Sequence, residues 1–559
     1  MTTQEFNIAL THEAISEALA DREAIVWRDR RLTYGDLTDR SRRLATYLHR
    51  AGFGVRRERA DLAPHESGQD HVALYLYNGN EYLEGMLGAF KARCVSVNVN
   101  YRYVADELRY LLQNSESKAI IYHSKFAPLL AEIRDDLPEI TLWLQVADDS
   151  GEPLLPGAVD YEEALASVPA DLPDVGHSPD DLYMIYTGGT TGMPKGVLWR
   201  QHDIFMSAMG GRTPGVWDPV TSYDEVVDRA VNGMGGVMLM IPPLMHGAAQ
   251  WSAFILMHQG AKLLIPDENR RMDPASVLRA LEREKASTMT VTGNAVMRPL
   301  LDEMKTEKYD LSSLTIIGNG SAIMTEELKA EVLDFLPNTL INDSVGASET
   351  GAQGSHLSVK GATSTGRFGT GPGLVVLDVF MEKLHEPGHE EPGWMAQSGW
   401  VPLGYLNDPE KSARTFPVID GQRYAVPGDR ARLLESGEME LLGRDSVSIN
   451  TGGEKVFVEE VEKAVASHPA VRDVTVAGRP HERWGNEVVA VVEFVEGASA
   501  TEAELAAHVG KALAPYKVPK GWVVVDRIQR SPSGKADYRW AKKLAAEAAE
   551  AAESAGGAG

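Results

Sequence analysis

Cysteine is almost absent from this 559-residue sequence, which contains only Cys94. A single cysteine excludes a framework of intrachain disulfides and is typical of a reducing compartment, so we expect a cytoplasmic protein. Long apolar runs are absent too, since none reaches the ~18 residues of a membrane-spanning helix. The first residues carry acids instead of the basic stretch and apolar core of a signal peptide. We therefore expect a protein with no membrane span and no secretion signal.

Positive charge is scarce as well. The chain has 55 Lys and Arg against 80 Asp and Glu, which gives a formal net charge of −25. This balance argues against nucleic acid or an anionic membrane as the main partner. The cations that hold any anionic ligand must then be few and local. The length is too great for one ordinary domain and suits a large body plus a smaller unit.

The first 180 residues predict alternating helices and strands. Thr33 and Asp36 form a capping box that begins a helix, and Gly52 ends it. The segments 71–77, 80–94 and 95–100 follow as strand, amphipathic helix and strand, with Tyr82, Leu83, Met86, Leu87 and Phe90 predicted to point inward. This βαβ pattern indicates a parallel sheet. Further strands are predicted at 118–123, 181–187, 261–266, 287–292 and 314–320.

A second, smaller unit is predicted to begin near residue 443. Between residues 457 and 528 its pattern is helix, strand, strand, helix and strand, typical of a compact α+β domain. The fold class that we predict is α/β, a large multilayer body with parallel-type sheets plus this small C-terminal domain. The predicted boundaries are 1–443 for the body and 444–541 for the small domain. Residues 542–559 form an Ala/Glu/Gly-rich flexible tail, a frayed helix or disorder.

The stretch "MIYTGGTTGMPKGV", Met184 to Val197, has the composition of a phosphate cradle. It is not the common P-loop, G-x-x-x-x-G-K-[ST], because Lys195 lies between proline and glycine. It directly follows the predicted strand 181–187, and loops at the carboxyl ends of strands are where open α/β sheets bind ligands. Glycine-rich turns are common, so this loop alone leaves phosphate binding open.

The stretch "YTGGTTGMPKGV" resembles the phosphate-binding loop of the adenylate-forming superfamily, which comprises acyl-CoA synthetases, luciferases and peptide adenylation domains. Further stretches resemble the motifs of that superfamily in the expected order: "PPLMHGAA" (242–249), "IIGNGSA" (316–322), "INDSVGASETG" (341–351), "GYLNDPEKSARTF" (404–416), "YAVPGDRARL" (424–433), "GRDSVSINTGGEKV" (443–456) and "RSPSGKADYR" (530–539). The resemblance extends from about Arg31 to Arg539. The joint order of the motifs makes it specific.

The resemblance implies an enzyme that joins a carboxylic acid to coenzyme A by way of an acyl-adenylate, with ATP, Mg²⁺ and coenzyme A as ligands. Negative charge gathers on the α-phosphate in the transition state, and a cation aimed there lowers the barrier. The implied catalytic residues are Lys535, Glu349, Thr190 and Lys195, with Glu349 also the metal ligand. The implied nucleotide and coenzyme contacts are Thr187, Gly188, Gly189, Thr191, Gly192, Gly320, Ser321, Asn342, Asp343, Ser344, Ser348, Asp429, Arg444 and Gly453. The implied acid pocket contains His246, Gly247 and Trp251.

Each of these residues also has an ordinary interpretation. Asp429 and Lys535 suit exposed turns, and His246 on an apolar segment suits simple packing. Four positions depart from the superfamily pattern: Gly188 for serine, Val345 for tyrosine, Ser446 for aspartate and Asn450 for lysine. None of them removes a catalytic group. The superfamily's small domain is thought to swing between two poses, one for Lys535 and one for the loop around Gly453.

The segment 234–254 is predicted to line the acid pocket and contains no Lys or Arg, which disfavours a second carboxylate. Met238, Met240 and Met245 are predicted as adaptable fillers. We therefore expect an apolar acid of medium chain length or larger, as in the actinobacterial ligases for long-chain and steroid side-chain acids. Residues 210–236 are predicted as a surface loop at the entrance. An acyl-AMP ligase serving a carrier protein, a luciferase-like oxygenase and a non-catalytic binding protein stay as alternatives, and a homodimer stays open.

Overall fold

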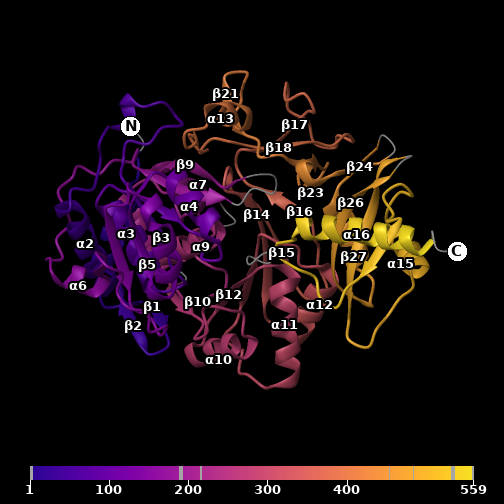
Figure 1. Cartoon of the computed structure of the whole chain (residues 1–559), viewed down its shortest axis with the longest axis horizontal. Coiled ribbons are helices and arrows are strands. Elements are labelled where there is room, and N and C mark those ends of the chain that lie inside the picture. The colour runs from indigo at the N-terminus through magenta and orange to yellow at the C-terminus, as the bar shows by residue number, and fades with distance from the viewer. Residues whose placement is uncertain are drawn as a thin grey trace.

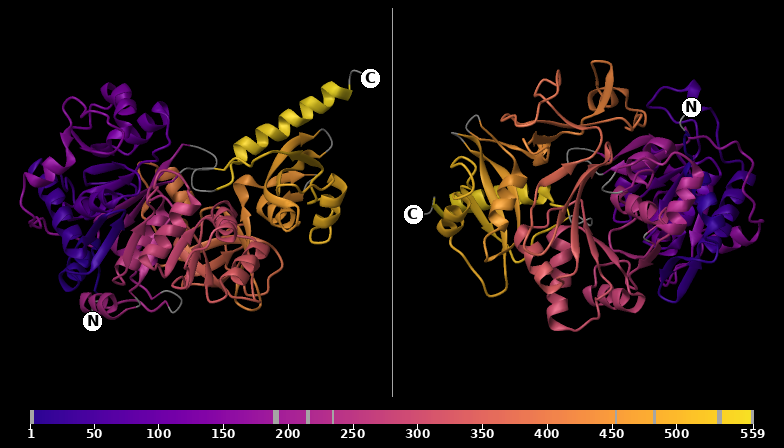
Figure 2. Two further views of the ribbon diagram at one scale, coloured as in Figure 1. Left: turned by 90° about the horizontal axis from the view of Figure 1, so that it is seen from below. Right: turned by 180° about the vertical axis from the view of Figure 1, so that it is seen from behind.

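The computed structural model describes residues 4–187, 193–213, 217–233, 235–451, 454–481, 484–530 and 535–556. A large body, formed by the chain up to Arg444, carries a smaller C-terminal part at one end (Figure 1). Two further views show the last helix lying along this smaller part (Figure 2). The two-part arrangement predicted from the sequence is confirmed.

A five-stranded parallel sheet lies in the N-terminal part of the body, in the order β4-β3-β5-β6-β7. Its strands are β3 (His71–Tyr75), β4 (Val95–Asn98), β5 (Ser117–His123), β6 (Leu142–Val146) and β7 (Val159–Asp160). The neighbouring helices are α1 (Ile8–Ala18), α2 (Tyr34–Arg50), α3 (Asn80–Lys91), α4 (Ala105–Asn114), α5 (Ala127–Ile133) and α6 (Tyr161–Ala166). Both the βαβ unit and the capping box of Thr33 and Asp36 are confirmed.

A second, longer sheet runs through the body, and within the described residues it has fifteen strands. Its first part is β1 (Glu23–Trp27), β2 (Arg30–Thr33), β10 (Val237–Met240), β11 (Lys262–Ile265), β12 (Thr288–Val291), β13 (Ile316–Asn319) and β14 (Leu340–Ala347). From β1 to β14 the central strands are parallel, and the helices of this region are α9 (Gly247–Met257), α10 (Pro274–Glu284), α11 (Gly293–Thr306) and α12 (Glu326–Phe335).

The same sheet becomes antiparallel beyond β14. This part contains β15 (Gly351–Ser358), β16 (Arg367–Thr370), β17 (Leu374–Leu377), β18 (Gly393–Ser398), β20 (Val418–Ile419), β21 (Gln422–Ala425), β22 (Asp429–Leu433) and β23 (Met439–Arg444). Helix α13 (Pro409–Thr415) precedes β20. The segment from β14 to β15 therefore lies where the sheet changes direction, and it carries the predicted residue Glu349.

The strand before the glycine-rich loop lies in a different kind of sheet from the one expected. β8 (Leu182–Thr187) pairs antiparallel with β9 (Lys195–Arg200), so that Thr187 faces Lys195, and β9 also pairs with β19 (Gly404–Tyr405). The prediction of an open parallel-sheet position for this loop was wrong. The connection of residues 188–194 is too short for a parallel crossover, which needs a dozen or more residues.

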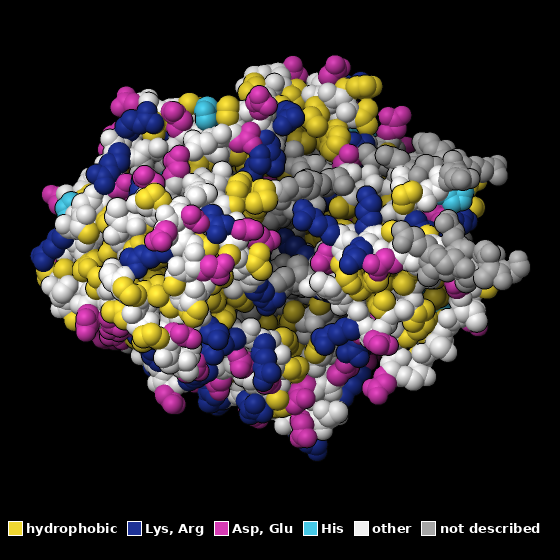
Figure 3. Space-filling view, viewed as in Figure 1, with side chains coloured by type: hydrophobic (Ala, Val, Ile, Leu, Met, Phe, Trp, Pro, Cys, Tyr) yellow, Lys and Arg dark blue, Asp and Glu magenta, His cyan; other side chains and the backbone are white. Residues whose placement is uncertain are grey.

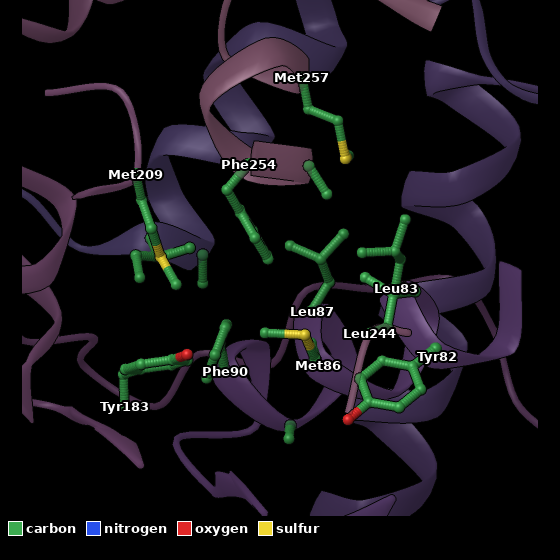
Figure 4. Close-up of a cluster of buried hydrophobic side chains, with 14 of the residues drawn as sticks. Tyr82, Leu83, Met86, Leu87, Phe90, Tyr183, Met209, Leu244, Phe254 and Met257 are labelled. Atoms are coloured by element: carbon green, nitrogen blue, oxygen red, sulfur yellow. The ribbon is translucent and has the colours of Figure 1, made fainter. Parts of the chain in front are cut away.

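A buried apolar cluster joins three of these elements (Figure 4). Met86, Leu87 and Phe90 of α3 meet Tyr183 of β8 and Phe254 of α9 there. The residues predicted to point inward from α3 are all buried. Dense packing of this kind holds β8 and α9 rigidly relative to each other. It therefore positions the phosphate-loop strand and the helix of the predicted acid pocket as one unit.

The prediction of a surface loop over residues 210–236 is wrong for part of this segment. After α7 (Gln201–Ala208), residues Tyr223–Asn232 form helix α8, capped by the Ser222 side chain, which accepts from the Glu225 N–H. Val226 and Ala230 of this helix are buried. α8 packs against α1. The helix forms because its apolar residues are spaced for one buried face, although its overall composition is polar.

The small C-terminal part has the predicted order of helix, strand, strand, helix and strand, preceded by a two-stranded hairpin that was not predicted and followed by a last helix. The elements are β24 (Ile449–Thr451), β25 (Glu454–Val456), α14 (Val458–Ala466), β26 (Val471–His481), β27 (Gly485–Phe494), α15 (Glu502–Val509), β28 (Gly521–Val524) and α16 (Tyr538–Gly556). Its core is rich in valine, as expected for strands buried against helices. Within the predicted tail, residues 542–556 belong to α16, and the last three residues lie outside the described part of the chain. In the part of the chain that the structure describes, no helix combines the length and apolar character needed to cross a membrane.

Candidate active site

A cavity of about 1640 Å³ lies between the body and the small part, and the space-filling view shows a central hollow (Figure 3). It is lined by the ends of β13 and β14, by α9, and by residues of the small part. The predicted site residues that line it are Thr187, His246, Gly247, Trp251, Gly320, Ser321, Asn342, Asp343, Ser344, Ser348, Glu349, Asp429, Arg444 and Lys535. The predicted residues Gly188, Gly189, Thr190, Thr191, Gly192 and Gly453 lie outside the described residues.

Four charged groups from distant segments face this cavity together. Asp429 and Arg444 lie opposite each other on β22 and β23, and Arg444 Nε is 3.2 Å from Asp429 Oδ1. Lys535 lines the cavity from the small part, and its side chain is exposed there. Desolvation by the surrounding protein lowers the pKa of Lys535, as does Arg444, while Glu349 and Asp429 oppose that shift. The arrangement presents cations to an anion while two carboxylates limit the net positive charge.

The Glu349 carboxylate is held by a residue that sequence reasoning missed. The Tyr405 hydroxyl donates a hydrogen bond of 2.7 Å to Glu349 Oε1. Burial together with the Glu349 charge raises the pKa of Tyr405, so this hydroxyl keeps its proton. Tyr405 belongs to the "GYLNDPEKSARTF" motif, which was recognised only as a marker of family. Within this motif, the Gly404–Tyr405 pair was the feature from which a role for Tyr405 could have been predicted.

Lys195 lies at the start of β9 and forms an ion pair with Asp408, which belongs to the same motif as Tyr405. Lys195 is not among the residues that line the cavity. In this structure the Lys195 side chain is therefore paired with Asp408, close in sequence to the glycine-rich loop. Its predicted contact with phosphates stays a prediction.

Asp343 is already engaged by neighbouring protein groups. Lys329 Nζ lies 2.5 Å from one carboxylate oxygen and Asn319 Nδ2 donates to the other over 2.7 Å. Lys329 is fully buried, so this pair ties α12 to β14 beneath the cavity. Nearby, Ser321 has a φ of +66°, an uncommon backbone conformation for a residue with a side chain. A turn of this kind directs the Gly320–Ser321 backbone toward the cavity.

The predicted acid pocket begins at the N-terminus of α9. His246 is the N-cap residue, and burial, with help from the charges of Lys535 and Arg102, lowers the pKa of His246 to about 3. The imidazole is therefore neutral at physiological pH. One turn further, Trp251 Nε1 donates to the Tyr183 hydroxyl over 3.3 Å. Met238 lines the cavity as predicted, whereas Met240 and Met245 are buried outside its lining, which corrects the prediction for those two.

A second missed residue, Glu459 of α14, lies at the junction of the two parts. The Arg444 N–H donates to Glu459 Oε1 over 3.3 Å. Gly443 has a φ of +121°, and a Cβ there would lie 2.2 Å from Glu459 Oε2. A side chain at this position would strain the backbone and displace the Glu459 carboxylate, which favours glycine. Burial raises the pKa of Glu459 to about 7. The junction is thus built on Gly443, Arg444 and Glu459.

Comparison with known proteins gives two family matches. Residues 12–399 match the model of the AMP-binding enzyme, and residues 460–535 match the AMP-binding enzyme C-terminal domain. The chain is 54% identical to the medium-chain acyl-CoA ligase Mig of Mycobacterium avium, over 97% of this chain and 99% of that protein. It is 39% identical to a medium/long-chain-fatty-acid–CoA/3-oxocholest-4-en-26-oate–CoA ligase of Mycolicibacterium smegmatis, over 97% of both chains.

Solved structures support the same fold. The anthranilate CoA ligase AuaEII in complex with anthranoyl-AMP is 21% identical, with a TM-score of 0.81 and 98% of each chain covered. MatB from Rhodopseudomonas palustris with bound ATP is 23% identical, with a TM-score of 0.78, covering 96% of this chain and 99% of that one. These likenesses confirm the large α/β body with a small C-terminal domain.

Proposed function

Because the chain belongs to the AMP-binding enzyme family, we propose that it is an ATP-dependent acyl-CoA ligase acting on an apolar carboxylic acid. The reaction joins the acid to coenzyme A through an acyl-adenylate and releases AMP and pyrophosphate. The observation that carries the proposal is the convergence of Lys535, from the small part, with Glu349, Asp429 and Arg444 at one cavity.

Each residue has a distinct part in the proposed first half-reaction. A carboxylate is a poor electrophile, and its attack on the α-phosphate of ATP makes AMP its leaving group. Lys535 stabilises the negative charge that develops between the carboxylate and the α-phosphate. Asp429 accepts hydrogen bonds from the ribose hydroxyls, and Arg444 supports the ribose or phosphate through charge-assisted hydrogen bonds. Neutral His246 lines the acid's carboxylate end without adding a charge.

The residues present also suit a magnesium ion carried with the nucleotide. Mg²⁺ prefers one or two carboxylates together with phosphate oxygens and water. Glu349 supplies such a carboxylate at the cavity, oriented by Tyr405. In the described residues no cluster of three or more His, Cys, Asp or Glu side chains is suited to a metal. Bound Mg²⁺ would neutralise phosphate charge, and the orientation of Glu349 is the contribution of this chain.

The acid is proposed to be a medium-chain, long-chain or steroid side-chain acid. The names of the two relatives support this range, and the cavity is large enough for a bulky acyl group. Coenzyme A is the proposed acceptor, and Gly453, which lies outside the described residues, is proposed to take part in its binding. We further propose that the body ends at residue 443 and the small domain spans 444–541, with 542–559 as a tail. The glycine-rich loop would hold the ATP phosphates through Thr190 and Thr191.

A competition assay tests the proposed function. Purified protein, Mg-ATP and coenzyme A are incubated with a mixture of short, medium, long and steroid side-chain acids, and thioesters are identified by mass spectrometry. The expected result is one dominant apolar acyl-CoA, formed only when ATP and coenzyme A are both present. Pyrophosphate without any thioester would instead indicate an acyl-AMP ligase. The absence of both pyrophosphate and thioester with every acid would refute the proposal.

A further inference from the structure

Arg212 is a buried arginine in the wall of the same cavity. It follows α7 and is 8% exposed. Its Nε donates to the Met206 carbonyl over 2.7 Å and its Nη2 to the Ser207 carbonyl over 3.1 Å. The guanidinium carbon lies 5.1 Å from the ring centre of Trp217 and 5.4 Å from that of Trp400. Two carbonyls and two aromatic faces therefore hold the group in a fixed orientation.

Arg212 carries a charge that no carboxylate of the described residues balances. Among the residues that the structure describes, Arg212 has no ion pair, and its Nη1 makes no hydrogen bond. The equally buried Arg93, by contrast, pairs with both Glu58 and Asp181. Burial alone lowers the pKa of Arg212 to about 10. A buried charge without an opposite charge is unfavourable, and hydrogen-bond acceptors supplied by a ligand would reduce that unfavourable energy.

The backbone just before Arg212 lies beside the C-terminal half of α9, away from His246. A Cβ on Gly210, two residues earlier, would lie 3.6 Å from the Ile255 Cα, so the turn after α7 packs on the third turn of α9. Ile255 lies eight residues after Gly247, which is about 12 Å along a helix. His246, at the near end, lies within the electrostatic influence of Lys535. Between the two ends, Ala248 and Trp251 offer apolar surface.

We propose that Arg212 recognises an acceptor oxygen at the far end of the acid, a ketone oxygen or a second carboxylate, through the free edge of its guanidinium. This inference rests on the proposed function and adds a polar requirement to an otherwise apolar pocket. An acid whose carboxylate lies at Lys535 and whose hydrocarbon follows α9 presents its far end to Arg212. The sequence disfavoured a second carboxylate because the segment 234–254 has no Lys or Arg, and Arg212 enters from outside that segment.

A structural role is the competing explanation. Arg423 donates to the Pro402 and Leu403 carbonyls and lies 5.0 Å from the Phe416 ring centre, much as Arg212 does with its own neighbours. Arg423, however, is not among the residues that line the cavity. The two explanations differ in one measurable respect. A structural arginine affects all acids alike, whereas a recognition site affects only those acids that carry the distal oxygen.

The experiment measures kcat/KM for three acids of equal carbon number: the plain acid preferred in the competition assay, its analogue with a ketone near the far end, and the corresponding dicarboxylic acid. The proteins are the wild type, Arg212→Met, Arg212→Lys and the exposed control Arg271→Met. For at least one oxygenated acid, Arg212→Met is expected to lower the ratio to the plain acid by about 10- to 100-fold, which corresponds to about 1.4–2.7 kcal/mol. Arg212→Lys should lower it less, and Arg271→Met should leave it unchanged.

The wild type provides an independent check if Arg212→Met fails to fold, which thermal unfolding would show. In a purely apolar pocket both oxygenated acids would react at least about tenfold less efficiently than the plain acid. Rejection of both by the wild type, or equal losses for all three acids in Arg212→Met, would overturn the inference. The oxygenated acid on which the wild type keeps its activity shows whether Arg212 recognises a ketone or a carboxylate. If the wild type formed no thioester from any acid, the proposed function would fail instead.

Discussion

Lys535 owes its proposed role to its position in the fold. In the sequence it is a lysine in a "PSGK" turn, a setting shared by many exposed residues. The fold carries it across to a cavity that contains Glu349 and Asp429, and desolvation by the surrounding protein lowers its pKa. Its ammonium group thereby faces a cavity that an anionic ligand can enter, beside two carboxylates and Arg444. A cation held at the point where negative charge develops stabilises a transition state more strongly than a lysine that moves freely in solvent.

Replacing Lys535 by alanine should separate the two half-reactions. Adenylation, measured as pyrophosphate exchange into ATP in the presence of the acid, is expected to slow by about 10²- to 10³-fold. Thioester formation from supplied acyl-adenylate and coenzyme A should change by less than about tenfold. In this step the thiol attacks the acyl carbon, and no new bond forms at the α-phosphate. Lys542→Ala on α16, at an exposed position, is the control. Comparable damage to both half-reactions would contradict the assignment.

The sequence predicted individual site residues only where a motif contained them. Asp429 and Arg444 were both predicted, and their pairing across β22 and β23 agrees with a shared ligand. Tyr405 and Glu459 were missed because their partners, Glu349 and Arg444, are far away in the sequence. A contact between distant segments leaves no local pattern.

At the scale of elements, periodic patterns predicted most helices and strands but not all of their partners. The helix that begins at Thr33 and the valine-rich strands of the small part follow from local pattern alone. The pairing of β8 did not, because an apolar strand has the same pattern in a parallel or an antiparallel sheet. The short connection to β9 was the deciding feature. Helix α8 was missed because its two buried residues lie within a polar, glycine-rich stretch.

Helix α14 makes a pH-dependent contribution to stability. Its buried Glu462 accepts hydrogen bonds from the Val476 N–H and the Tyr538 hydroxyl, and burial together with the neighbouring Glu459 raises the pKa of Glu462 to about 8. Arg530 and Tyr538 partly offset that rise. The folded state therefore binds this proton more tightly than the unfolded state does, where the pKa is near 4.5. Ionising Glu462 therefore lowers the free energy of unfolding. This loss is absent at pH 4, grows as the pH rises, and is complete above pH 8.

Glu462→Gln should remove that pH-dependent loss. Relative to the wild type, the variant is expected to gain roughly 2 kcal/mol or more in free energy of unfolding between pH 5 and pH 8.5. Urea denaturation at several pH values measures the difference. Glu460→Gln is the matched control, because Glu460 lies on the same helix and pairs with Lys517 over 2.7 Å near the surface. A Glu462→Gln difference that stays constant across this pH range would show that Glu462 is not buried as a neutral acid.

At the scale of the whole molecule, the orientation of the small part decides what faces the cavity. Beyond the Gly443–Glu459 junction, polar contacts hold this orientation: Lys463 Nζ donates to the Thr365 carbonyl over 2.7 Å, and Arg472 lies 3.7 Å from Asp302. Surface contacts of this type are individually weak, so we expect them to oppose only slightly the swing that the resemblance implies for the small part. The sequence cannot fix such an orientation, because the same elements form in either pose and only the contacts between the two parts change.

Locking this orientation should allow adenylation and block thioester formation. Glu326 and Lys463 face each other across the two parts, 3.4 Å apart at their charged atoms, and their replacement by cysteines permits a short bismaleimide cross-link. The only native cysteine, Cys94, is fully buried and will not compete for the reagent. We expect the cross-linked protein to keep most of its pyrophosphate exchange and to lose at least about tenfold in thioester formation, because Lys535 then stays in the cavity. The single-cysteine variants treated with the same reagent are the controls. Full thioester turnover in the cross-linked protein would mean that both half-reactions use this one orientation.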